Sequence, residues 1–87
     1  MHKGSKASNN VQDIQLRART GMRVGEVQQE AHNSFCLALL CEEQGNNHGS
    51  IPHFERFYYC AKLLEDREGQ EIALNRISIA FFMQMKL

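Results

Sequence analysis

A chain of 87 residues has room for at most one domain, with a modest hydrophobic core. Its hydrophobic content of 43% permits a packed core and argues against disorder along the whole chain. Ten basic and ten acidic residues cancel, and this balance argues against a dedicated nucleic-acid-binding surface.

The N-terminal part is polar and basic. Its first residues are small and polar, so we expect a disordered tail over 1–9 and a helical region over 10–87. Asn10 is a candidate N-cap for a short helix, Asp13 a candidate partner in its capping box, and Gly21 a candidate C-cap. We interpret the excess of basic residues here as a solvated face rather than as an arm for an acidic partner.

A second helix is predicted from about Val24 to Gln44, because apolar residues recur there at helical spacing. Two small residues, Ala31 and Ala38, lie two turns apart and would let another helix approach closely. Gly45 is suited to a left-handed C-cap. The expected core stripe consists of Ala31, Phe35, Ala38 and Leu39, widened by Leu37, Leu40 and Cys41.

A third helix is predicted from about Ser50 to Glu65, with Ser50 as its N-cap and Pro52 in its first turn. Tyr59 falls outside the apolar stripe, so we expect it to face outward or toward a neighbouring unit. A stacking platform for single-stranded nucleic acid is an alternative for these aromatic residues, but core packing is favoured. The stripe consists of Phe54, Phe57, Tyr58, Ala61 and Leu64.

A fourth helix is predicted from about Gly69 to Lys86, after a polar break at 66–69. Its expected core face comprises Ile72, Ala73, Ile77, Ala80 and Phe81, and Ile79, Phe82 and Met83 make much of the remaining circumference apolar. A helix that is apolar nearly all round should be buried. No later segment is left to cover it, so we expect self-association through this helix.

Two segments 40 residues apart share a pattern: Leu37-Ala38 followed by Cys41, and Ile77-Ser78 followed by Phe81. At these residues the chain resembles the tetratricopeptide repeat (TPR) family, although the interval exceeds that family's usual period of about 34 residues. The similarity is to a variety with longer helices. The residues that the resemblance assigns to packing between repeat helices are Leu37, Ala38, Cys41, Gly45, Phe54, Tyr58, Ala61, Ile77, Ser78 and Phe81.

The resemblance implies an all-α fold of about four helices, arranged as antiparallel hairpin repeats in an α-solenoid fragment. One full hairpin would lie near 26–65, with a half-unit on either side. The implied function is a non-enzymatic scaffold that binds protein partners, including peptide segments, and neither nucleic acid nor membrane. Partner-binding candidates are Asn33, Cys36, Tyr59 and Arg76. A narrower similarity to repeat proteins of cilia and flagella suggests a cilium or the cytoskeleton as the location.

The alternative is a small helical metal-binding or thiol-dependent enzyme domain that uses His32, Cys36 and Cys41. His32 and Cys36 stand at i and i+4, which places them on one helix face. Structural zinc usually needs four ligands in paired short spacings, so we expect no metal, cofactor or catalytic residue. The three cysteines form no CxxC motif and are predicted to be buried free thiols in a reducing, cytoplasmic compartment. The sequence contains no apolar run long enough for a bilayer span.

Overall fold

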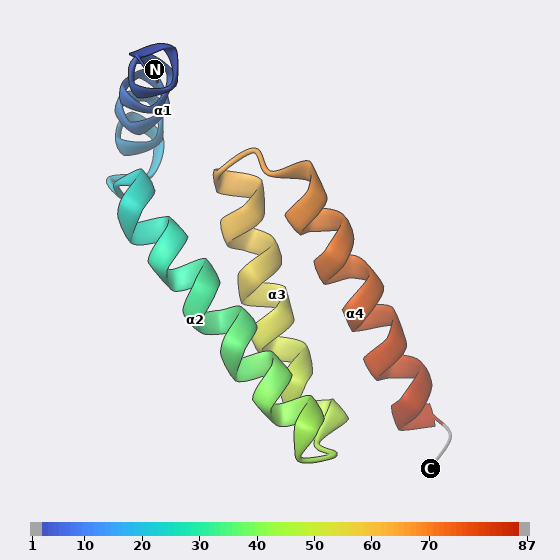
Figure 1. The fold of residues 1–87 in the computed structure, drawn as a ribbon. Coiled ribbons are helices and arrows are strands. Elements are labelled where there is room, and N and C mark those ends of the chain that lie inside the picture. Colours follow the sequence, from blue (N-terminus) through green and yellow to red (C-terminus); the bar gives the residue numbers. More distant parts are fainter. Residues whose placement is uncertain (1–2, 86–87) are drawn as a thin grey trace.

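The computed structural model describes residues 3–85 and is all-α. Its helices are α1 (Lys3–Thr20), α2 (Val24–Glu43), α3 (Asn47–Leu63) and α4 (Arg67–Met85). The helices pack sequentially, and α2, α3 and α4 run antiparallel with α3 between the other two (Figure 1). The predicted fold class of four helices is therefore confirmed, whereas their organisation into repeats remains a prediction. Residues 1–2 of the predicted tail, and Lys86 at the predicted end of the fourth helix, lie outside the described residues.

Helix α1 lies beyond the start of α2 and turns away from it instead of packing along it (Figure 1). Two hydrogen bonds hold it there. Gln12 Nε2 donates to Leu64 O at 2.9 Å, and the Asp13 carboxylate accepts from Val24 N at 2.8 Å. Asp13 therefore caps the start of α2, not the start of its own helix as predicted. The predicted start of the first helix at Asn10 is also wrong, because α1 begins at Lys3.

The two turns that flank α3 have the same C-cap geometry. Gly45 has φ = 77° and Glu65 has φ = 56°, and in each case the next residue donates its N–H to a carbonyl five residues earlier. These left-handed residues satisfy carbonyls that the helix end leaves without an intrahelical partner. The predicted left-handed C-cap at Gly45 is confirmed, and Gly21, with φ = 78°, also has the left-handed conformation at the end of α1.

The start of α3 differs from the prediction. Asn46 is the N-cap, and its side chain accepts from Gly49 N at 2.9 Å. A Cβ on Gly49 would lie 2.3 Å from Asn46 Nδ2, so this close approach requires glycine. Ser50 is not the cap: it lies inside the helix, is fully buried, and donates its hydroxyl to Asn47 O at 2.8 Å. Pro52 is consequently beyond the first turn of α3.

The core is concentrated where α1, α2 and α3 meet. Leu16, Val27, Ala31 and Cys60 form a buried cluster there. The partly buried hydrophobic residues around the cluster are Met22, Val24, Phe57, Leu63 and Leu64. Burial of this cluster fixes α1 to the bundle through the hydrophobic effect, although α1 makes little contact with the rest of α2.

Helix α4 packs on α3 through a narrow line of small residues. Gly69, Ala73 and Ala80 are buried, and a Cβ on Gly69 would lie 3.2 Å from the Cβ of Ala61. The predicted core face of this helix is partly wrong, since Ile72 and Phe81 are exposed. The reason is geometric: a single neighbouring helix covers only one line of α4.

In the described part of the chain, no helix combines the length and apolarity that a bilayer span needs.

Candidate partner-binding surface

The C-terminal half of α2 carries an open depression of about 520 Å³, which we call the α2 depression. All of its lining residues come from α2. This helix carries more apolar residues than its contact with α3 can bury, so some of them stay exposed. Leu40 is exposed and Leu39 is half-buried, so the floor is apolar, while carboxylates lie at one end. The lining residues are Cys36, Leu39, Leu40, Glu42 and Glu43.

An ion pair joins the edge of this depression to α4. Arg76 Nη1 donates to Glu42 Oε1 at 2.8 Å, which ties together two helices that are not consecutive in the chain. Partly exposed ion pairs contribute little to stability, about 0–1 kcal/mol, so the main consequence concerns charge. Arg76 balances the charge of Glu42, and the exposed Glu43 gives the α2 depression a net negative charge.

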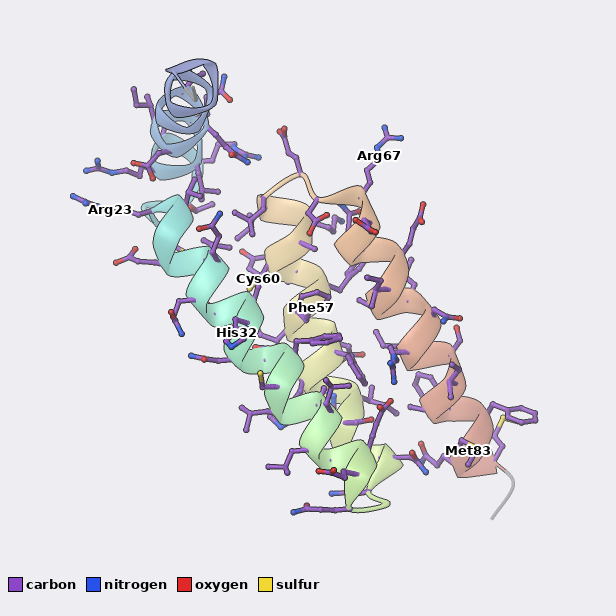
Figure 2. All side chains as sticks on the ribbon, in the orientation of Figure 1. Arg23, His32, Phe57, Cys60, Arg67 and Met83 are labelled. Atoms are coloured by element: carbon purple, nitrogen blue, oxygen red, sulfur yellow. The ribbon has the colours of Figure 1, made fainter. Side chains whose placement is uncertain are left out.

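The structure brings together two of the three residues of the metal or thiol alternative. Cys36 Sγ lies 3.6 Å from His32 Nε2, as the i, i+4 spacing predicts. Cys41 is half-buried and is not part of this pair. Among the side chains that the structure describes, no group of three histidine, cysteine, aspartate or glutamate residues could hold one metal ion. Figure 2 labels His32, whose side chain lies along the exposed side of α2.

The three cysteines are free thiols in different environments. Cys60 is buried, as predicted, whereas Cys36 is exposed and Cys41 is intermediate, so the prediction of three buried thiols is wrong. Burial raises the pKa of the Cys60 thiol, and the nearby Glu30 carboxylate raises it further. A raised pKa keeps the thiol protonated and makes it a poor nucleophile. Because Cys36 is exposed, it is the most accessible of the three thiols.

The other two partner-binding candidates lie outside the α2 depression. Asn33 is exposed and its side-chain oxygen accepts from Gln29 Nε2 at 3.2 Å. Tyr59 on α3 is 46% exposed, which confirms its predicted outward orientation. The Arg56 guanidinium lies 5.2 Å from the Tyr59 ring centroid and pairs with Glu30. The hydrogen bond to Glu30 raises the pKa of Arg56 above its ordinary value.

The residues assigned to repeat packing divide into four groups. Ala38, Phe54 and Ala61 are buried, and Phe54 packs edge-on against Phe35 with ring centroids 5.9 Å apart. Cys41, Tyr58 and Ile77 are half-buried, and Gly45 occupies a turn. Leu37, Ser78 and Phe81 are exposed.

The sequence does not predict that Leu39, Leu40 and Glu43 line the α2 depression, because apolar spacing places the two leucines in the expected core stripe. The available signal was an excess of apolar residues on α2, more than one buried face can hold. No protein-family model, curated protein sequence or solved structure matches this chain. The resemblance to TPR proteins consequently rests on the residues quoted above.

Proposed function

We propose that this chain is a non-enzymatic protein-interaction module, built as TPR-like helix hairpins, that binds a segment of a partner protein in the α2 depression. The observation that supports this proposal best is the exposed apolar floor beside an acidic end. Exposed apolar area of this kind, with charged groups at its edge, is typical of interaction sites. The predicted roles of Cys36 and Arg76 fit this surface, one as lining and the other as the partner of Glu42.

The chemistry of the depression suggests the chemistry of the segment. An aliphatic or aromatic side chain would pack on Leu39 and Leu40, and its burial would supply most of the binding free energy. A neighbouring lysine or arginine of the partner would approach Glu43. A charge at the rim of an interface contributes more to orientation and association rate than to affinity. The proposed ligand is thus an apolar segment with an adjacent cationic residue.

The two turns that flank α3 are built alike. Both turns that flank α3 combine a left-handed residue with an Asn or Asp N-cap that accepts from a glycine N–H three residues later. Asn46–Gly49 and Asp66–Gly69 therefore use the same capping arrangement twice, 20 residues apart.

The free thiols suit a reducing compartment, so we propose a cytoplasmic location, with a cilium or the cytoskeleton as the specific setting.

Selection from a library of random displayed peptides tests the proposal. We expect the immobilised protein to enrich peptides that contain an apolar residue next to lysine or arginine. The same peptides should fail to bind a Leu40→Glu variant, because a carboxylate would occupy the apolar floor. A Glu55→Lys variant is the matched control, since Glu55 is exposed on α3 outside the depression. Enrichment of the same peptides by the Leu40→Glu variant would refute the proposed site.

A further inference from the structure

Helix α1 carries an exposed apolar face with a basic residue beside it. Ile14 is 66% exposed, and the exposed Arg17 follows it three residues later. These two residues belong to an open hollow of about 420 Å³ on the surface of α1. We call the residues that line this hollow the α1 face: Ile14, Arg17, Ala18 and Gly21.

The charges of the chain are divided between two parts of the sequence. Residues 1–25 contain five basic residues and one acid, Asp13, so their net charge is +4. The Asp13 carboxylate is already bound, since it accepts from Val24 N. The whole chain has a formal net charge of zero, so the remaining residues, which include Glu43 of the α2 depression, carry −4. Each part therefore offers the charge that the other lacks.

We propose that the α2 depression of one copy of this chain binds the α1 face of a second copy, an inference that rests on the proposed function of the depression. In this contact Ile14 packs on Leu40, and Arg17 pairs with Glu43. Ile14 and Arg17 are three residues apart, as are Leu40 and Glu43, so the apolar contact and the ion pair form in one register. The α1 face thus supplies the ligand that the depression requires, an apolar residue with an adjacent cation.

The shapes and the neighbouring residues of the two surfaces also match. Ala18 and Gly21 are small, so the hollow of the α1 face has room for the Leu40 side chain, which is 48% exposed. Val11 and Leu37, each three residues before Ile14 and Leu40, continue the register on the two helices. They are 54% and 47% exposed, and their mutual contact would remove both from water.

The positions of the two surfaces require that the contact be between copies. Helix α1 and the C-terminal end of α2 lie at opposite ends of the molecule, whose longest dimension is 50 Å (Figure 1). The α1 face of a chain therefore cannot reach the depression of the same chain. A contact between two different surfaces leaves one of each free on every oligomer. Association consequently continues head to tail, beyond a dimer, unless the series closes into a ring.

Sedimentation velocity of the full chain between about 10 µM and 1 mM tests the association. One face of one helix on each side makes a contact smaller than a standard interface, so we expect weak association, with a mean mass that rises steadily above the 10.0 kDa monomer. Ile14→Glu and Leu40→Glu should each raise the dissociation constant at least about 10-fold, since each places a carboxylate in the apolar contact. Phe81→Glu is the matched control, because this side chain on α4 is 49% exposed and lies outside both surfaces. A wild-type monomer at about 1 mM, or association that only Phe81→Glu weakens, would overturn the proposal.

Mixing two variants tests the head-to-tail arrangement. Ile14→Glu keeps an intact α2 depression, and Leu40→Glu keeps an intact α1 face. An equimolar mixture should therefore form a species of twice the monomer mass and none larger, although each variant alone stays monomeric. A mixture that remains monomeric at concentrations where the wild type associates would contradict the contact between these two surfaces.

Peptide binding separates this inference from the proposed function. A library-selected peptide that occupies the depression should lower the mean mass of the wild type, because it competes with the α1 face. Ile14→Glu should bind the same peptide as tightly as the wild type. If the wild type binds the peptide but never self-associates, the α1 face is not the ligand and the proposed function stands. If the wild type does neither, both proposals are wrong.

Discussion

Replacing Phe54 by alanine removes the largest fully buried side chain of the structure. The Phe54 ring packs edge-on against Phe35 of α2, so the substitution loses an aromatic contact as well as buried apolar area. Phe→Ala in a core typically costs about 3–5 kcal/mol. A domain of this size has a total free energy of unfolding of about 4–13 kcal/mol, and a small core places it toward the lower end. We therefore expect Phe54→Ala to remove most of the stability.

The assay is urea unfolding followed by circular dichroism at 222 nm, at low protein concentration. Phe81→Ala is the matched control, because it removes the same atoms from a side chain that is 49% exposed. We expect Phe81→Ala to lower the free energy of unfolding by less than about 1 kcal/mol. Equal losses for the two variants would refute the assignment of Phe54 to the core and of Phe81 to the surface.

Other changes test the caps, the buried thiol and the metal alternative. Glu65→Gly should raise the free energy of unfolding by about 0.5–1 kcal/mol, since Glu65 has a positive φ that glycine adopts more easily. Gly45→Ala should lower the free energy of unfolding by about 1 kcal/mol, because it places a Cβ at a positive φ. Urea unfolding measures both changes. Asp13→Ala should cost about 1 kcal/mol by leaving Val24 N without its cap, and Asp13→Asn, which keeps an acceptor, should cost less. Because the pKa of folded Cys60 is raised, its contribution to stability is complete below the ordinary cysteine pKa of about 8.5 and is lost as the pH rises above it. A Cys60→Ala variant should therefore show a shallower decline of stability from pH 8 to 10 than the wild type. Plasma emission spectrometry of protein purified without chelator should find no stoichiometric zinc, because the His32–Cys36 pair offers two of the four usual ligands.

The helices and most of their ends could be predicted from the sequence. Glycine at a helix end, and the acidic or amide residue that caps the next helix, act through contacts with nearby backbone. Gly21 and Gly45 adopt the left-handed conformation that few other residues reach easily. The start of α3 was misplaced because Asn46 and Ser50 are both good N-caps, and propensity alone does not choose between them. In the structure the Asn46 side chain lies so close to Gly49 that a Cβ at position 49 would displace it.

The faces of the helices could be predicted only in part. On α2, apolar residues surround much of the helix, and which of them are buried depends on the direction from which α3 approaches. Ala31 and Ala38 face α3, while Leu37 and Leu40 are exposed. The position of α1 is a tertiary effect of the same kind. The carboxylate that caps α2 comes from Asp13, 11 residues earlier, and no local pattern identifies that contact.

The central claim is that the α2 depression binds a partner segment through an apolar floor and an acidic end. The most direct test is the affinity of a library-selected peptide, measured by fluorescence anisotropy for the wild type, Glu43→Lys and Glu55→Lys. We predict a dissociation constant about 10-fold higher for Glu43→Lys, because reversal of this charge repels the cationic residue of the peptide. Glu55→Lys should stay within about 2-fold of the wild type, since Glu55 lies on another helix. Equal affinities for all three proteins would contradict the claim.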